Sequence, residues 1–307
     1  RGLSSAAPAD EQTLQDWGLR FLGQAGVDYA LNPMLRGVYA ARPSELCLLS
    51  TFPAFAPRPG ETLLGALRRR RKEGRRRMMA AKNGNQEVVE CLVNTLANMP
   101  GVRMRLNSSV EQITSGKNFL LTGSSQSAAQ LLQRINPATA ELLKGIIYLP
   151  LVTATVFVAT PTLKRRGVGV LFPEREDAHG LGILFNSDAF PGRVRNEAAV
   201  SSFTCIFGGS SQPGVLREDA AKLDERIHGD LERILGFRPQ VLERVIQRWP
   251  NALPLYSPEH RKILQKAQEA LARTPAIAVF GNYTGQISAR GIWQQVLSWP
   301  PAGSLSQ

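Results

Sequence analysis

The chain has 307 residues, of which 43% are hydrophobic, and it carries a net charge of +12. A chain of this length holds one large domain or two ordinary ones, with enough apolar residues for a packed core. No apolar run reaches the roughly 18 residues that cross a bilayer, and the first residues lack the apolar centre of a secretory signal. Its three cysteines are widely spaced in apolar surroundings, which predicts buried thiols in a reducing compartment and argues against a disulfide framework.

Part of the positive charge is concentrated in Arg68–Arg77, which reads RRRRKEGRRR. Such a block binds the phosphates of anionic lipid headgroups or of nucleic acid, or it forms no more than a solvated helix or loop. No aromatic residues interleave with the arginines, and no nucleic-acid-binding motif accompanies them. A nucleic acid partner is therefore not expected, and an acidic membrane surface is the functional alternative that we retain.

Helical patterns dominate the first 100 residues. Leu14, Trp17 and Phe21 share one face of a helix that Asp10 is placed to cap. Further helices are predicted over residues 26–40, 44–52, 61–79 and 85–97.

From residue 102 the pattern changes to short apolar strands. Strands are predicted over residues 102–106, 109–113, 119–123, 151–160, 168–173, 181–186, 199–209, 241–249 and 277–281, and most of them form an antiparallel sheet. Helices are predicted over residues 125–146 (in two pieces around Pro137), 215–236 and 258–272.

The stretch 276–296 is a buried strand, a turn containing Gly281 and Gly285, and the start of a helix. Glycine permits backbone angles and close approaches that a side chain forbids. The first turn of a helix presents free N–H groups and the positive end of the helix dipole. This arrangement is typical of a cofactor-facing turn, although many ordinary α/β proteins also end in strand, turn and helix.

Four segments follow one another in an order that is specific. They are NPMLRGVYAARPSELCLLSTFP, GVGVLFPEREDAHGLGILFNSDAFPGR, RWPNALPLYSPEHRKIL and GNYTGQIS. Together they resemble the oxygen-dependent protoporphyrinogen oxidases, flavoproteins of the amine oxidase group, over residues 12–296. The resemblance implies an α+β and α/β fold of the flavin amine oxidase type. It has a helical subdomain, a mostly antiparallel substrate-domain sheet and the C-terminal part of an FAD domain.

The same resemblance implies a division of the chain. Residues 1–100 are expected to form the helical subdomain on the membrane and substrate side, and residues 125–247 the substrate-binding sheet. Residues 101–124 and 248–296 are expected in the FAD domain, and residues 297–307 in a flexible tail. The expected location is the cytoplasm or the periphery of an inner membrane, bacterial or mitochondrial. A homodimer is one option for the assembly.

The resemblance also implies positions for both ligands. The tetrapyrrole would lie against an apolar wall of Val168, Gly169, Leu171, Leu184 and Ile206, where Gly169 lets the main chain approach the macrocycle. For FAD, the implied contacts are Val110 near the adenine or ribose, Trp249 beside the flavin, and Ile287, Ser288 and Ala289 at the helix start. For each apolar residue the plainer alternative is ordinary core. No acid or base is assigned a catalytic role, and no metal site is expected, because no histidine has a partner at metal or triad spacing.

The activity that the resemblance implies is the oxidation of protoporphyrinogen IX to protoporphyrin IX. Hydride passes from the macrocycle to the flavin, and oxygen is the final acceptor. Members of the group begin with a strand, GxGxxG and a helix that hold the FAD diphosphate. The residues here contain no such segment, so the chain is expected to be incomplete and to show little turnover as it stands.

Three alternatives remain open. The first is a degenerate paralogue that binds porphyrin or a partner protein without catalysis. The second is another amine oxidase-type flavoenzyme, such as a carotenoid desaturase or polyamine oxidase, and the third is a basic module that docks to acidic membranes. Porphyrin fluorescence, oxidation of porphyrinogen compared with amines, and liposome binding distinguish them.

Overall fold

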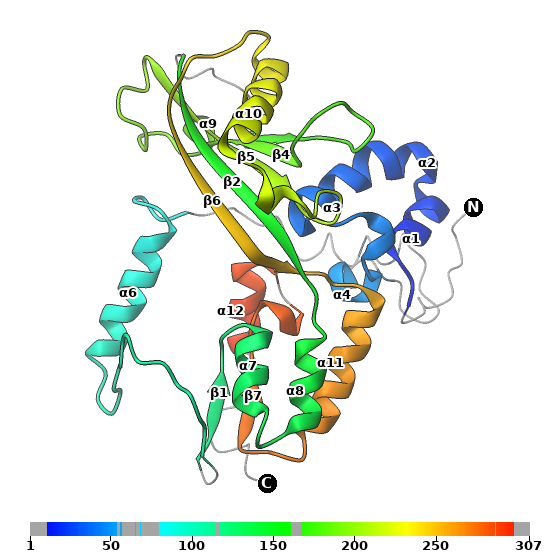
Figure 1. Cartoon of the computed structure of the whole chain (residues 1–307), viewed down its shortest axis with the longest axis vertical. Helices are drawn as coiled ribbons and strands as arrows, with labels where there is room; N and C mark the ends of the chain where they lie inside the picture. The colour runs from blue at the N-terminus through cyan, green and yellow to red at the C-terminus, as the bar shows by residue number, and fades with distance from the viewer. Residues whose placement is uncertain are drawn as a thin grey trace.

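The computed structural model describes residues 11–53, 56, 65, 68, 80–114, 117–160, 167–285 and 287–297. Its larger sheet has the strand order β3-β4-β5-β2-β6, and every neighbouring pair is antiparallel (Figure 1). The strands are β2 (Tyr148–Ala159), β3 (Gly169–Leu171), β4 (Gly182–Phe185), β5 (Val200–Gly208) and β6 (Val241–Pro254). The predicted antiparallel sheet is confirmed.

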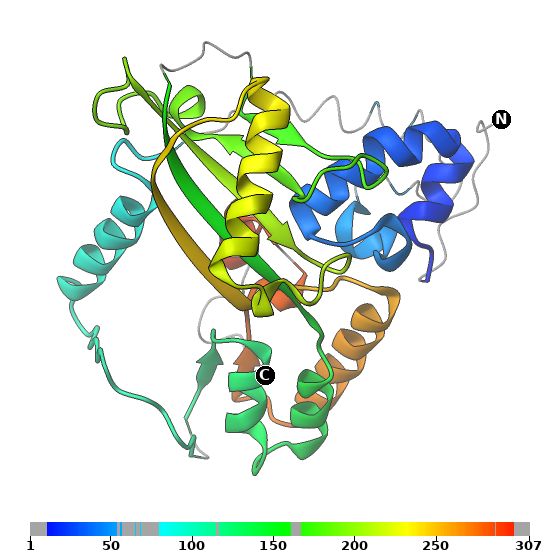
Figure 2. The same ribbon diagram turned by 45° about the horizontal axis from the view of Figure 1, so that its top comes forward.

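Strand β2 shows why the sheet forms. Val152, Ala154, Val156 and Val158 are fully buried, and the residues between them are only partly buried. This period of two gives the sheet one apolar face. Helix α10 (Ala220–Leu235) covers that face with its own apolar stripe, and Figure 2 shows it lying in front of the sheet.

The N-terminal helices form a second apolar cluster. They are α1 (Leu14–Phe21), α2 (Gly23–Gly26), the π-helical η1 (Val27–Leu31), α3 (Asn32–Tyr39), η2 (Pro43–Glu45) and α4 (Leu48–Thr51). Thr13 caps α1 in a reciprocal box with Asp16. The expected cap, Asp10, lies outside the described residues. We call the buried residues of these helices, together with Leu149, Leu181 and Tyr256, the helical cluster.

A smaller parallel sheet pairs β1 (Phe119–Leu121) with β7 (Ile277–Val279). Helices α7 (Ser125–Leu132), α8 (Pro137–Lys144) and α11 (Pro258–Leu271) pack with it in a third apolar cluster. Residues 125–144 therefore pack with the smaller sheet, and the expected division of the chain into domains stays a prediction. The remaining elements are α9 (Asn186–Ala189), η4 (Val215–Arg217), η5 (Asn282–Thr284) and α12 (Ala289–Leu297).

Helix α6 (Asn85–Ala97) stands apart from both sheets (Figure 1) and has no buried residue. The strands expected over residues 102–106 and 109–113 are wrong, since the structure assigns no strand there. The alternation of apolar residues is present, but a strand also needs a hydrogen-bonded partner, and none of the described segments supplies one. The helix expected over residues 61–79 lies outside the described residues, apart from Gly65 and Arg68. Within the described parts of the chain, no helix has the length and apolar character needed to span a lipid bilayer.

Candidate functional site

The second face of the larger sheet, opposite α10, carries the candidate site. Thr153 and Thr155 on β2 point away from the buried valines and are half-buried. Across the sheet, Thr153 pairs with Ile206 and Thr155 pairs with Thr204, so these side chains share one surface. We call this surface the candidate face.

Two leucines give the candidate face its apolar end. Leu184 on β4 pairs with Thr204 on one side and with Gly169 on the other. Leu171 lies two residues beyond Gly169 and therefore on the same side. The side chains of Leu171 and Leu184 are 44% and 43% exposed. Large apolar side chains left half open at neighbouring strand positions are a common feature of ligand-binding surfaces.

Two more of the predicted substrate residues, Gly169 and Val168, lie at the β3 edge of the sheet. A Cβ atom on Gly169 would lie 2.4 Å from the Ile183 carbonyl oxygen, so the close pairing of β3 with β4 requires this glycine. The expected role of Gly169 in admitting a macrocycle stays a prediction. Val168 lies one residue before β3, so it does not share the alternating positions of Gly169 and Leu171. It is exposed at the edge of the sheet.

Helix α3 closes over the β3 end of the candidate face. Gly37 faces the tip of Leu171, because a Cβ atom at Gly37 would lie 2.3 Å from Leu171 Cδ2. The preceding residue, Arg36, is buried and donates from Nη1 to the Phe172 carbonyl at 3.2 Å and from Nη2 to Ser211 Oγ at 3.2 Å. Burial lowers the pKa of Arg36 below that of a free arginine. Arg36 thus fixes α3 to the strand that carries Leu171.

The centre of the candidate face is polar but uncharged. The hydroxyls of Thr155 and Thr204 are 3.0 Å apart, and Asn186 Nδ2 donates to Thr204 Oγ1 at 2.9 Å. At the β6 edge, Trp249 Nε1 donates to Thr153 Oγ1 at 3.1 Å, and its ring remains 47% exposed. The alternative of Trp249 as a core residue is therefore wrong, since its ring lies open on the candidate face. Hydroxyls and amides surrounded by apolar side chains orient a ligand without requiring that it carry charge.

The C-terminal turn has the geometry that the sequence predicted. Gly285 has a φ of +119°, which disfavours any side chain. Ser288 then caps α12: its Oγ accepts from the Gly291 N–H at 3.0 Å, and its carbonyl accepts from Ile292 at 2.9 Å. Ala289 follows as the first, exposed residue of α12. The helix start is therefore open to the surface, as a cofactor-facing turn requires.

The turn and the candidate face pack against the same apolar cluster. Ile287 and Ile206 are both partly buried, and both pack against the helical cluster. Figure 2 shows α12 behind the sheet, on the side away from α10. The turn therefore lies on the side of the sheet that carries the candidate face.

Val110 is not part of this arrangement. It lies in the extended stretch before residue 114 and is 63% exposed. The neighbouring residues Glu111 and Ile113 line a cavity of about 530 Å³, shared with α7 and Lys144. The predicted contact of Val110 with an adenine or ribose stays a prediction.

The described residues fit the ring end of a flavin. The open start of α12 supplies N–H groups and a positive dipole end, which favour negative charge on a reduced flavin ring. Ile287 and the candidate face supply an apolar side for a planar group. Among the described residues, we find no glycine-rich loop before a helix that would cradle a diphosphate.

The histidines lie away from the candidate face. Of the three histidines, His260 is buried in α11, and burial lowers its pKa to about 4. His228 and His179 lie near α10, on the opposite face of the sheet. Within the described ranges, no group of three metal-ligating side chains comes together.

These features define the class of protein: an antiparallel sheet with an open apolar face, joined to a strand, glycine turn and helix that suit a flavin ring. The model of the flavin containing amine oxidoreductase family matches residues 2–289, and the chain belongs to this family.

Relatives support a finer comparison. The chain is 25% identical to protoporphyrinogen oxidase 2, chloroplastic/mitochondrial, of Arabidopsis thaliana, covering 91% of this chain and 64% of that protein. It is 22% identical to coproporphyrinogen III oxidase of Bacillus subtilis, covering 88% of this chain and 62% of that one. The chain thus spans less than two thirds of the length of these relatives.

Solved structures confirm the fold. A protein from Exiguobacterium sp., provisionally described as a protoporphyrinogen oxidase, superposes with a TM-score of 0.70 at 20% identity, covering 96% of this chain and 69% of that chain. Cyclohexylamine oxidase from Brevibacterium oxydans superposes with a TM-score of 0.54 at 12% identity, covering 94% and 68%. The predicted flavin amine oxidase-like fold is confirmed.

The sequence did not predict the polar centre of the candidate face or the contact that Gly37 makes with Leu171. A signal for the first was present, because Thr153 and Thr155 alternate with buried residues along β2. Hydroxyls at every second position of an apolar strand must lie on one face. No local signal marks Gly37, because its neighbour Leu171 is remote in the sequence.

Proposed function

We propose that this chain forms the substrate side of an FAD-dependent oxidase that removes hydrogen from a porphyrinogen, with oxygen as the acceptor. The observation that carries the proposal is the apolar surface of Leu171, Leu184 and Ile206, on the side of the sheet where the turn and α12 also lie. A porphyrinogen has a broad apolar macrocycle that carries acidic side chains, and the macrocycle itself needs a wide apolar lining with few polar groups. The relatives named for protoporphyrinogen and coproporphyrinogen oxidation support a tetrapyrrole over an amine.

The residues of this chain have binding and positioning roles. Leu171 and Leu184 contact the macrocycle and exclude water from it, and Ile206 continues this surface toward the turn. Ile287 and the start of α12 place the ring end of FAD beside the substrate. When bound, FAD accepts hydride from the substrate and passes the electrons to oxygen. No side chain has to act as an acid or base, because holding the macrocycle beside the flavin ring supplies much of the rate enhancement.

Titration of the purified chain with protoporphyrin IX, the planar product, tests the binding function. We expect saturable quenching of porphyrin or tryptophan fluorescence, weakened in Leu171→Ala and Leu184→Ala variants. Quenching that does not saturate, or that both variants retain in full, would contradict the proposal.

A second measurement tests the reaction. A protein that carries this chain together with the rest of the length seen in its relatives is assayed with protoporphyrinogen IX, coproporphyrinogen III and benzylamine. Oxidation of a porphyrinogen supports the proposal. Oxidation of the amine alone would assign the chain to a different branch of the family, and porphyrin binding without turnover would favour the degenerate paralogue.

A further inference from the structure

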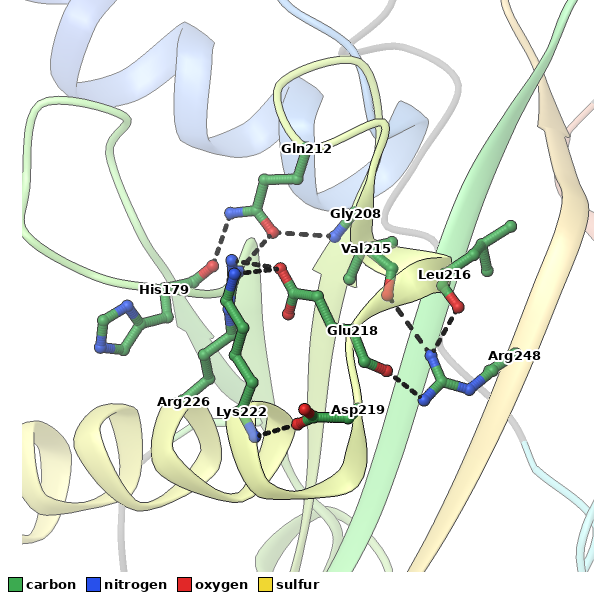
Figure 3. Close-up of polar contacts among 10 residues, drawn as sticks. All are labelled: His179, Gly208, Gln212, Val215, Leu216, Glu218, Asp219, Lys222, Arg226 and Arg248. Atoms are coloured by element: carbon green, nitrogen blue, oxygen red, sulfur yellow. Dashed lines mark hydrogen bonds and ion pairs between the residues drawn. The ribbon is translucent and has the colours of Figure 1, made fainter.

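The β3–β4 hairpin enters β4 through the peptide groups of His179 and Gly180, and two distant side chains hold them. On α10, Asp230 Oδ1 accepts from the His179 N–H at 2.8 Å, and Oδ2 accepts from the Gly180 N–H at 2.7 Å. The Asp230 side chain is 1% exposed. From the other side, Gln212 Nε2 donates to the His179 carbonyl at 2.6 Å (Figure 3).

Gln212 is itself held in place. Its Oε1 accepts from the Gly208 N–H, at the end of β5, at 3.2 Å and from Arg226 Nη1 at 3.1 Å. Arg226 also forms an ion pair with Glu218 at 2.6 Å (Figure 3). The hairpin entry is therefore tied both to β5 and to α10.

The pairing of the hairpin begins immediately after this point. The Leu181 N–H donates to the Ile206 carbonyl at 2.7 Å, and the Phe172 N–H donates to the Leu181 carbonyl at 3.1 Å. Gly180 has no room for a side chain, because a Cβ atom there would lie 2.9 Å from both Asp230 Oδ2 and the Ile206 carbonyl oxygen. Leu184 lies three residues after Leu181, and Leu171 directly precedes Phe172. The hydrogen bonds of Leu181 and Phe172 therefore fix the strand positions from which both leucine side chains extend.

We propose that Asp230 and Gln212 are positioning residues that hold Leu171 and Leu184 in the arrangement that binds the planar ligand. The inference rests on the proposed function, and it concerns residues on the far side of the sheet from the ligand. A carboxylate that accepts two backbone N–H groups makes strong, charge-assisted hydrogen bonds, and its geometry is more restrictive than that of a single neutral one.

The surroundings of Asp230 indicate that the two N–H groups are the main contacts that offset the energetic cost of burying its carboxylate. Burial raises the pKa of the Asp230 carboxyl, and the N–H groups of His179 and Gly180 oppose this, as do the charges of the His179 ring and Arg233. Arg233 itself bonds to Glu176 and to the Asp177 carbonyl, so it is only a remote partner. Cys205 on β5 also faces the carboxylate, and burial raises the pKa of its thiol.

The test compares Asp230→Asn with Asp224→Asn in the whole chain. The amide keeps the shape of Asp230 but turns one acceptor into a donor that faces an N–H. Asp224 lies on the same helix and forms a surface ion pair with Arg244 at 2.8 Å, so D224N is a matched control. Gln212→Leu, on the other side of the His179 peptide, is a second variant at a half-buried position.

Two quantities are measured for each folded variant: the affinity for protoporphyrin IX and the methyl NMR shifts of Leu171 and Leu184. We expect D230N to weaken binding about tenfold, the loss typical of a charge-assisted hydrogen bond. We also expect it to move both sets of methyl resonances, with smaller changes in the same direction for Q212L and none for D224N.

Different results separate the two proposals. If D230N melts at a lower temperature yet keeps the wild-type affinity and methyl shifts, Asp230 is only structural and the inference is overturned. If the wild-type chain binds no porphyrin, the proposed function fails, and unchanged leucine methyl shifts in D230N would then overturn the positioning role on their own.

Discussion

Gly37 of α3 and Leu171 of β3 are packed so closely that a Cβ atom at Gly37 would lie 2.3 Å from Leu171 Cδ2. A helix from the first part of the chain thus determines the conformation of a side chain on the candidate face. Under the proposed function, this contact links α3 to the residues that bind the ligand.

Gly37→Ala should displace the Leu171 side chain rather than unfold the protein, because the tip of a leucine can change rotamer at a cost of about 0.5–1.5 kcal/mol. We expect porphyrin affinity to fall about tenfold, and the double variant with Leu171→Ala to match Leu171→Ala alone. Fluorescence titration of the three variants provides the measurement. Fully additive losses would show that Gly37 acts independently of Leu171.

Leu184→Ala should lower porphyrin affinity about tenfold, because truncation removes about 1.4 kcal/mol of apolar contact with the ligand. Since the side chain is already 43% exposed, thermal stability should change by less than about 1 kcal/mol. Leu120→Ala is the matched control, on the other sheet and 53% exposed. Equal effects of the two substitutions on binding would remove Leu184 from the site.

Gly285→Ala should destabilise the C-terminal turn by about 1–2 kcal/mol, because residue 285 has a φ of +119° and a Cβ atom disfavours this conformation. Gly214→Ala is the control: its φ is −84°, and a Cβ atom there would also meet open space. Thermal unfolding of both variants gives the comparison. A Gly285→Ala protein as stable as Gly214→Ala would show that the turn tolerates a side chain.

Acid should destabilise the protein partly through His260. Burial lowers the pKa of His260 from its usual 6.5 to about 4, and the backbone of Tyr283 only partly opposes this. As the pH falls below 6.5, the unfolded chain takes up this proton while the folded chain does not, so stability present above pH 6.5 is lost between 6.5 and about 4. His260→Gln should remove up to about 3 kcal/mol of that pH dependence. Denaturant unfolding at several pH values measures it, and identical slopes for both proteins would refute it.

The basic block Arg68–Arg77 should bind acidic vesicles. Replacing its arginines by glutamine is expected to reduce co-sedimentation with phosphatidylserine liposomes, since each basic residue near such a surface contributes about 1 kcal/mol. Binding by the wild-type chain should weaken at high salt. Co-sedimentation that survives the replacement would exclude this block as a membrane contact.

Local chemistry explains why much of the fold was predictable. The start of α8 shows this well. The Asn136 side chain accepts from the Thr139 N–H at 3.0 Å, and Pro137 occupies the first turn of the helix. Both preferences can be read from the sequence. The stretch 102–113 shows the opposite case, because alternating apolar residues describe a strand only when another segment pairs with it.

The candidate site was predictable in part, but for a different reason. The resemblance to the protoporphyrinogen oxidases implied Leu171, Leu184 and Ile206, and strand pairing places the three on one face. Asp230 was not predicted, although it falls among Leu223, Ile227 and Leu231 on the buried stripe of α10. An acidic residue at an apolar position was the available signal. Its partners, the N–H groups of His179 and Gly180, belong to a loop far away in the sequence, and no local pattern identifies them.

The parallel pairing of β1 with β7 has a consequence for synthesis of the chain on the ribosome. Phe119 finds its partner Ile277 only after the whole larger sheet has been translated. Closing so long a loop is slow, since the ordering entropy precedes any gain from the contact. The antiparallel strands are therefore expected to assemble before β7 pairs with β1 and completes the smaller sheet.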